Sequence, residues 1–248
     1  MTLGSLIKTS TASAALIFSA ACSQAASEPT SVSSKDKAAI EKIVHAYIVE
    51  NPEVIIEALQ VLEERQEIAS AEQKSAFLPA FLNLENAPSL GPKDAPITIV
   101  EFFDYNCGFC KSSKDWVLDQ VDSGDIRVVF MELPVLDSRT KTSALAARAS
   151  IAAHMQGKYR ELHSAMLGAS GLTKGRILTL AKEAGLDTQQ LAKDMESANA
   201  YRLLEDTMKL AEQADILATP SFYVNGKFVS GANFPLLNQH IAAARGSK

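Results

Sequence analysis

The chain has 248 residues, 47% of them hydrophobic, and a formal net charge of −5. This length and apolar content allow one large domain or two smaller ones with a full core. The acidic balance disfavours nucleic acid as the main partner, because nucleic-acid-binding domains present a basic patch. No internal repeat is visible, so a solenoid or a propeller has no support.

Residues 1–21 have the layout of a bacterial secretory signal peptide. Lys8 is the only charge before Glu28, and residues 12–21 (ASAALIFSAA) form a short apolar core that ends in small residues. This core is too short to span a bilayer, and no later segment reaches the roughly 18 consecutive apolar residues of a transmembrane helix. The mature protein is therefore expected in the periplasm, where disulfides form and persist.

The end of this signal allows two cleavage sites. SAAC at 19–22 resembles the lipobox of bacterial lipoproteins, in which Cys22 would be acylated and become the new N-terminus. SQA before Ala26 suits ordinary signal peptidase and would remove Cys22. A lipid on Cys22 would be the only attachment to a membrane. With either site, the mature protein keeps two free thiols, Cys107 and Cys110.

Residues 22–36 are serine-rich and predicted to form a flexible linker, followed by a predicted helical arm at 37–85. In the arm, apolar residues recur at helical spacing on both sides of Asn51 and Pro52, which suit the cap and first turn of a second helix. Such an arm can pack on its own domain or associate with other copies of the chain. Two tethered helices have little core of their own, which favours self-association.

A proline-rich boundary at 86–97 precedes a strand–helix–strand pattern. Residues 97–103 and 126–133 are predicted to be buried strands, and a helix over about 107–122 joins them. This order implies a right-handed crossover and a parallel pair of strands. The class is therefore α/β.

The second half of the sequence changes to helical patterns and then returns to strands. Residues 137–214 are predicted to be a helical insertion, with a helix stop at Gly185 and a capping pair at Asp187 and Gln190. Asn225-Gly226 is a strong type I′ hairpin signal, and a helix follows it. We assign residues 91–136 and 215–248 to one domain, which the insertion interrupts.

Cys107 and Cys110 stand at the junction between the first buried strand and the helix after it. A C-x-x-C pair in this context is typical of a thioredoxin-like redox motif. A structural zinc site needs four ligands, and the four histidines are scattered without the usual short spacing, so no metal site is predicted. A reduced dithiol can still bind copper(I) incidentally.

Taken together, these features resemble the DsbA family of thioredoxin-fold thiol–disulfide oxidoreductases. The resemblance rests on EFFDYNCGFC at 101–110, the helical insertion and ATPSFYVNG at 218–226, and it covers residues 95–245. Residues 40–66 further resemble the N-terminal segment of ScsC-like members, which are linked to copper tolerance and include trimeric isomerases. The implied structure is a thioredoxin-like fold with a helical insertion domain and an N-terminal helical arm.

The resemblance also implies roles for individual residues. Thr219 and Pro220 would be joined by a cis peptide bond beside the cysteines and would pair with an extended client. Glu101 would be the buried carboxylate beneath the helix that moves a proton for Cys110. From the strand pattern alone, Glu101 shares a face with apolar residues, and burial there should raise its pKa. The redox group would be the Cys107–Cys110 disulfide itself, with no further cofactor.

The position of Cys107 at a helix start predicts a nucleophile, because first-turn amides and the helix dipole favour its thiolate. Cys110, one turn on, would resolve the mixed disulfide. Gly108 and Phe109, at the predicted client-binding surface, carry no charge and no side-chain donor. We therefore expect a thiolate less stabilised than that of the strongest oxidant, whose pKa is about 3.5, and an enzyme that leans towards isomerisation.

The expected partners are client proteins with cysteines, a membrane or periplasmic redox partner, and other copies of this chain bound through the arm. Two alternatives remain open at the level of the sequence. One is a monomeric oxidase of the DsbA type. The other is a non-catalytic protein that binds copper or acts like a chaperone.

Overall fold

The computed structural model describes residues 33–246, so the predicted signal peptide and Cys22 lie outside the described residues. The chain divides into two compact units, one up to Glu57 and one from Ala58. The division falls inside helix α2 (Glu53–Ser75) and therefore inside the predicted arm. Between residues 33 and 246, no helix combines the length and apolar character needed to cross a membrane.

The first unit consists of α1 (Ser34–Glu50) and the start of α2. The Ser33 side chain accepts the backbone N–H of Asp36, so α1 begins before the predicted residue 37. The predicted interruption is present: α1 ends at Asn51, whose backbone N–H donates to Tyr47 O at 2.8 Å. α1 buries no residue, which leaves its apolar side chains exposed.

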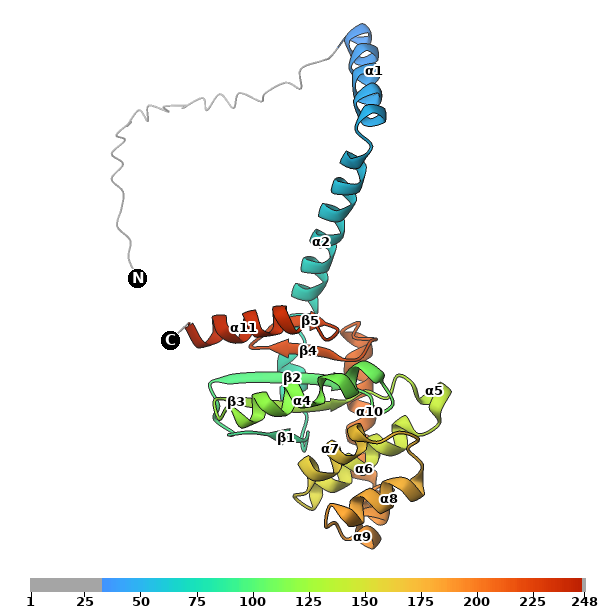
Figure 1. Cartoon of the computed structure of the whole chain (residues 1–248), viewed down its shortest axis with the longest axis vertical. Coiled ribbons are helices and arrows are strands. Elements are labelled where there is room, and N and C mark those ends of the chain that lie inside the picture. Colours follow the sequence, from blue (N-terminus) through green and yellow to red (C-terminus); the bar gives the residue numbers. More distant parts are fainter. Residues whose placement is uncertain (1–32, 247–248) are drawn as a thin grey trace, which may run out of the picture. The chain divides into compact units, whose positions relative to one another are not determined.

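A five-stranded sheet organises the second unit (Figure 1). Its strand order is β1-β3-β2-β4-β5. The two predicted buried strands, β2 and β3, are parallel, as expected, and β4 pairs with β2 in the antiparallel direction. The strands are β1 (Ser89–Leu90), β2 (Ile97–Phe103), β3 (Ile126–Glu132), β4 (Ser221–Val224) and β5 (Lys227–Ser230).

Helices cover both faces of this sheet. α4 (Gly108–Asp122) and α11 (Phe234–Gly246) cover the face that carries Ile97, Ile99 and Phe103. The opposite face, with Val100 and Phe102, packs against α3 (Leu78–Leu82) and α10 (Ala198–Gln213). α4 crosses in front of β2 and β3 in Figure 1, which brings its N-terminus to the end of β2.

The packing of α3 shows why the folded core begins earlier in the sequence than the predicted domain at residue 91. Phe81 of α3 is fully buried, with its ring centroid 4.7 Å from that of Phe102. β1 also lies before residue 91 and pairs with β3. The last third of the predicted arm, 37–85, therefore belongs to the sheet's own core.

The predicted insertion is helical, and most of its helices lie beyond β1 in Figure 1, whereas α10 packs against the sheet. Asp187 caps α9 (Thr188–Asp194) by accepting the backbone N–H groups of Gln189 and Gln190. The reciprocal half of the predicted capping pair is absent, because the Gln190 side chain donates to Asp194 instead. The remaining helices here are α5 (Asp137–Thr140), α6 (Ser143–Met155), α7 (Tyr159–Gly168) and α8 (Lys174–Glu183).

The predicted hairpin joins β4 to β5. Asn225 and Gly226 have φ values of 45° and 92°, both in the left-handed region that a type I′ turn requires. β4 pairs with β2, and the segment before β4 brings Thr219 O to 3.3 Å from Cys107 Sγ. This segment and the N-terminus of α4 form the two sides of the candidate site.

Candidate redox site at the start of α4

Cys107 is the residue that caps α4, and Cys110 lies in the first turn. The backbone of Cys107 is extended, with φ −77° and ψ 122°, and its side chain makes no capping hydrogen bond. Its N–H donates to Asp104 O at 3.0 Å, and Lys111 N donates to Cys107 O at 3.1 Å. The sulfur of Cys107 therefore lies beside the free amides of the first turn.

The loop before Cys107 is held by a buried aspartate that the sequence analysis did not single out. Asp104 Oδ1 accepts the N–H of Asn106 at 2.8 Å and the hydroxyl of Ser143 at 2.7 Å. Its Oδ2 accepts the N–H of Leu136 at 2.8 Å. Asp104 thus joins the active-site loop to the beginning of the helical insertion and fixes the position of Cys107.

Several donors lower the pKa of Cys107 to about 5. The Cys110 thiol has the largest effect, followed among the donors by the Cys110 backbone N–H, the Thr219 side chain and the Phe109 backbone N–H; burial of the thiol opposes them. The first-turn amides contribute as expected, but the neighbouring thiol contributes more. At neutral pH the Cys107 sulfur is therefore a thiolate.

The predicted neighbours lie beside this sulfur. The Thr219–Pro220 peptide bond is cis. In its thiol form, Cys107 donates through Sγ to Thr219 O at 3.3 Å. Phe109 is 72% exposed, and Gly108 adds no side chain, so the surface next to Cys107 is open. Gly108, Phe109, Thr219 and Pro220 therefore surround Cys107, although their part in binding clients stays a prediction.

Cys110 has the opposite environment. It is fully buried, and burial raises its pKa far above the ordinary value, with a further increase from Cys107 and from the charge of Glu101. Both cysteines are free thiols in this structure. One turn of helix therefore carries an acidic sulfur near the surface and a protonated sulfur in the interior.

Glu101 lies on β2 beneath α4, where the strand pattern placed it. It is 1% exposed, and burial raises its pKa to about 8. Ser113 Oγ lies 3.4 Å from Glu101 Oε1 but only 2.9 Å from Cys110 O, so its single hydroxyl hydrogen favours the latter. Glu101 Oε2 has no hydrogen-bond partner. The expected rise in pKa is confirmed, while the role of Glu101 in proton transfer stays a prediction.

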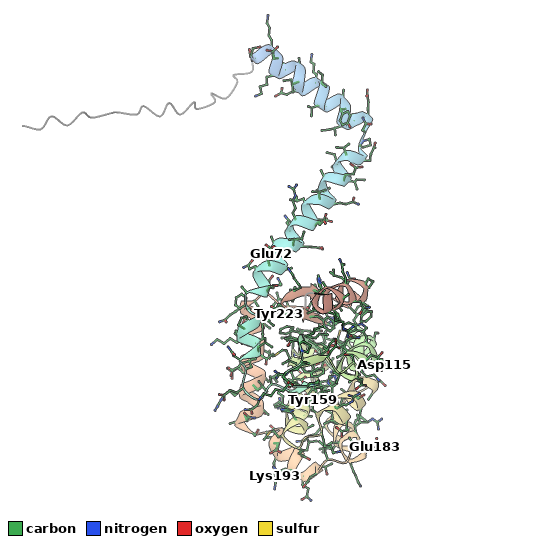
Figure 2. All side chains as sticks on the ribbon, turned by 90° about the vertical axis from the view of Figure 1, so that its left-hand side faces the viewer. Glu72, Asp115, Tyr159, Glu183, Lys193 and Tyr223 are labelled. Carbon is green, nitrogen blue, oxygen red and sulfur yellow. The ribbon has the colours of Figure 1, made fainter. Side chains whose placement is uncertain are left out.

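A second buried carboxyl, Glu132 at the end of β3, was missed by the sequence analysis. It is 3% exposed and accepts a hydrogen bond from Tyr159, which Figure 2 labels within this unit. The Tyr159 ring stacks on His163, which in turn contacts Tyr105. The strand pattern contains the signal that could have revealed it. Residues 126, 128, 130 and 132 alternate on one face, so Glu132 continues a buried row just as Glu101 does.

Cys107 and Cys110 supply two soft thiol ligands at this site. Among the residues that the structure describes, no group of three or more histidine, cysteine or acidic side chains is arranged to hold a metal ion. The arrangement offers a nucleophilic thiolate, a second thiol to displace it and a buried acid–base group. These are the elements of thiol–disulfide exchange.

Comparison with known proteins agrees with this chemistry. The family model described as thioredoxin matches residues 83–236. The chain belongs to the thioredoxin family. A second model, described as the copper resistance protein ScsC N-terminal domain, matches residues 36–69. The predicted resemblance to DsbA-type thioredoxin-fold proteins with an ScsC-like N-terminal segment is therefore confirmed.

Solved structures show the extent of the likeness. A thioredoxin-like oxidoreductase from Silicibacter pomeroyi is 38% identical, with a TM-score of 0.62 over 68% of this chain and 96% of that chain. BcfH from Salmonella enterica Typhimurium is 28% identical, with a TM-score of 0.69 over 86% of this chain and 97% of that one. ScsC of Proteus mirabilis, 21% identical, shares the fold, with a TM-score of 0.62 over 88% and 99% of the two chains.

The curated relatives are longer proteins. An Na(+)/H(+) antiporter, NhaA 1 of Salinispora arenicola, is 31% identical over 158 residues, which are 62% of this chain and 24% of that protein. This chain thus spans about a quarter of the length of the curated relatives it matches.

Proposed function

We propose that this protein is a periplasmic thiol–disulfide oxidoreductase that exchanges disulfides with client proteins through Cys107 and Cys110. The observation that carries the proposal is the contrast between the two sulfurs. The pKa of Cys107 is lowered to about 5, whereas burial raises that of Cys110. Attack requires a thiolate, and a good leaving group is a thiol of low pKa, so Cys107 suits both roles.

In the reducing direction, the Cys107 thiolate attacks one sulfur of a client disulfide. A bond forms between Cys107 Sγ and that sulfur, the client S–S bond breaks, and the released client sulfur leaves as a thiolate that takes a proton from water. The open surface at Gly108 and Phe109 gives a client access to Cys107. The carbonyl of Thr219, 3.3 Å from Cys107 Sγ, would accept a hydrogen bond from the client backbone.

Cys110 then resolves the mixed disulfide. Its thiol gives a proton to the Glu101 carboxylate and attacks Cys107 Sγ, and the second client sulfur leaves as a thiolate. The client gains two electrons, and the protein keeps a Cys107–Cys110 disulfide, which serves as its only redox group. A separate membrane or periplasmic redox partner would return that pair to its starting state. Oxidation of a client is the same sequence in reverse.

Two features support isomerisation over strong oxidation. The pKa of Cys107, about 5, lies above the value of about 3.5 found in the strongest oxidant, so the reduced form is less stabilised. The first unit exposes apolar side chains, including Ile43 and Tyr47, and an arm that joins several copies would place several active sites near one client. A monomeric oxidase remains the rival within the same chemistry.

Light scattering on the full chain tests the arm. The double variant Ile43→Asp, Tyr47→Asp should fall to the mass of a single chain, because two charges on an apolar contact oppose association. Lys42→Asp changes a charge on the same helix and serves as the control, which should keep the mass of the wild type. A wild type that already scatters as one chain would favour the monomeric oxidase.

The second candidate function is copper binding without catalysis. It is favoured by the match of residues 36–69 to the model described as a copper resistance protein. A reduced dithiol supplies two soft sulfur ligands, which suit copper(I). In this alternative, the cysteines hold the ion and need not cycle.

Reduction of insulin disulfides by dithiothreitol separates the two functions. The wild type should accelerate the reaction, and Cys107→Ser should abolish the acceleration, because no thiolate is left to attack. Cys110→Ser is the matched control: it should still attack but should accumulate a mixed disulfide that mass spectrometry detects. Full activity of Cys107→Ser would exclude the proposed enzyme and leave copper binding.

A further inference from the structure

The sheet face beneath α4 buries two carboxyl groups, and each keeps one oxygen without a partner. Glu101 and Glu132 are 1% and 3% exposed. The Oε2 atom of each lacks a hydrogen bond. Buried polar atoms are nearly always hydrogen-bonded, so two unpaired oxygens on one face require a physical explanation.

The strand register makes the two carboxyls diagonal neighbours. Glu101 lies opposite Phe130 across the β2–β3 pair, and Glu132 lies opposite Phe103. Alternate residues share a face, and a strand spacing of about 4.8 Å with a rise of about 3.3 Å per residue puts such a diagonal pair roughly 8 Å apart, within reach of long side chains. Burial raises the pKa of Glu132 well above its ordinary value, and the charge of Glu101 raises it further. The two groups therefore interact through the interior.

No cation neutralises this pair. Glu101 lies between Phe130 on β3 and Phe222 on β4. None of the ion pairs within residues 33–246 includes either glutamate. His163 packs against Phe130, but burial lowers the pKa of this imidazole to about 3, so it is neutral. The two carboxyls must therefore be stabilised by protonation and by hydrogen bonds.

The other polar groups that face the pair come from every element packed against it. Most are neutral donors or acceptors, and none of them is a cation in contact with either glutamate. The charge of Asp104 raises the pKa of Glu132, and that of Lys114 lowers the pKa of His163. The groups are Asp104 and Tyr105 after β2, Cys110, Ser113 and Lys114 on α4, Ser150 on α6, and Tyr159 and His163 on α7.

The hydrogen bonds of Glu132 favour Oε2 as the oxygen that carries its proton. Two hydroxyls reach Oε1: that of Tyr159 donates to it at 3.2 Å, and the single hydrogen of Ser150 is shared between Oε1 and Ala147 O, which lies 2.8 Å from Ser150 Oγ. Because Oε1 already accepts the bond from Tyr159 and Oε2 has no partner, we place the proton of the neutral acid on Oε2. That O–H needs an acceptor, and the unpaired Oε2 of Glu101 lies on the same sheet face.

We propose that Glu132 is a positioning residue for disulfide exchange: its Oε2–H donates to Glu101 Oε2, directly or through one buried water, and stabilises the Glu101 carboxylate. This inference rests on the proposed function, because it concerns the group that takes the proton from Cys110. During resolution, that proton moves from Cys110 Sγ to Glu101, while Glu132 keeps its own. Glu132 thereby sets the pH at which Glu101 can act as a base.

Infrared titration of the Glu101 carboxyl tests the link without any client. The C=O band of the protonated acid is followed against pH and assigned by its loss in Glu101→Gln. Glu132→Met removes the donor at similar size and should move the titration upward by roughly one pH unit, as expected for a lost hydrogen bond to a charged group. Glu132→Gln keeps an N–H donor and should stay near the wild type.

Two controls separate this effect from a general loss of structure. Tyr159→Phe removes a bond to the other oxygen of Glu132 and should move the titration much less than Glu132→Met does. The pH profile of client release from the mixed disulfide should shift upward in Glu132→Met. In the Glu101→Gln background, Glu132→Met should have no such effect. If Glu132→Met does not fold, the wild-type spectrum decides, because Glu132 must stay protonated while Glu101 ionises.

The outcomes distinguish this inference from the proposed function. A shifted infrared titration without any exchange activity would reject the enzyme and keep the link between the carboxyls. The link is overturned if exchange is intact but Glu132→Met titrates like the wild type, if Glu132→Gln shifts as much as Glu132→Met, or if Glu132 ionises before Glu101.

Discussion

The N-terminal helix and the sheet face beneath α4 depart from the usual distribution of residues in opposite directions. α1 buries no residue and leaves Ile43 68% and Tyr47 55% exposed. The sheet face buries Glu101 and Glu132 instead. In most folded proteins, apolar side chains gather inside, and carboxylates remain in water unless they are paired.

These two unfavourable features are stabilised in different ways. Exposed apolar surface is removed from water by contact with another surface, so α1 indicates an association. A buried carboxyl is stabilised by a proton or a hydrogen bond, so Glu101 indicates chemistry. The state of α1 should therefore depend on its binding partners, and the stability of the sheet face beneath α4 should depend on pH.

Glu101→Gln should give the largest effect on folding. The pKa of Glu101 is about 8 in the folded protein and about 4.3 in an unfolded chain. Stability is complete below the unfolded pKa and falls as pH rises towards the folded pKa, because the unfolded chain releases a proton that the folded chain retains. At about pH 9, the substitution should raise the free energy of unfolding by roughly 3 kcal/mol, less than the full linkage because the glutamine amide is also buried. Urea unfolding near pH 4 and pH 9 measures this.

Ile43→Asp is the matched comparison from the other region. It places a charge on an exposed surface of α1, so the unfolding of the second unit should not change at either pH. A gain of stability in Glu101→Gln that is equal at both pH values would contradict the buried titration. A large loss in Ile43→Asp would show that α1 is covered within its own chain.

The next largest expected effect concerns the reactivity of Cys107. At about pH 6, a thiol of pKa about 5 is mostly thiolate, whereas an ordinary thiol of pKa about 8.5 is roughly 0.3% thiolate. A thiolate of lower pKa is also a weaker nucleophile, with a Brønsted slope of about 0.4–0.5. The net gain in the reaction rate of Cys107 over an ordinary thiol is therefore roughly tenfold. Alkylation by iodoacetamide should therefore be about tenfold faster than that of glutathione near pH 6, with a midpoint near pH 5.

Mass spectrometry of the alkylated peptides assigns the reaction to Cys107 rather than to buried Cys110. The rate should fall tenfold per pH unit below the midpoint, because the thiolate becomes protonated. The double variant in α1 should leave this profile unchanged, since no residue of the first unit stabilises the sulfur. A midpoint near pH 8.5 would remove the thiolate on which the proposed function depends.

The sequence predicts the position of a site residue when a single local pattern determines that position. C-x-x-C at a strand–helix junction places Cys107 at the cap of α4, and alternation along β2 places Glu101 inside. Asp104 follows no such rule, because its partners Leu136 and Ser143 lie more than thirty positions away in the chain. Its importance arises only when the insertion closes over the loop.

The fold shows the same division between local and distant signals. The alternating strands and the Asn225-Gly226 turn are local, and both appear as expected. β1 was missed because a two-residue strand has no periodicity and exists only through pairing with β3. Phe81 looked like part of an arm, since its burial against Phe102 brings together segments that are far apart in the sequence.

The smallest expected effect compares two helix caps, one in each region. Asp187 accepts two backbone N–H groups at the start of α9, which buries Leu191, so Asp187→Ala should destabilise the second unit by about 1 kcal/mol. For a unit of this size, that loss lowers the melting temperature by roughly 2–4 °C. Ser33→Ala removes the equivalent bond from α1, which buries nothing. It should lower helical ellipticity slightly and leave the main melting transition in place. If both caps shift that transition equally, α1 unfolds together with the sheet, and its apolar side chains are covered in the protein as it exists in solution.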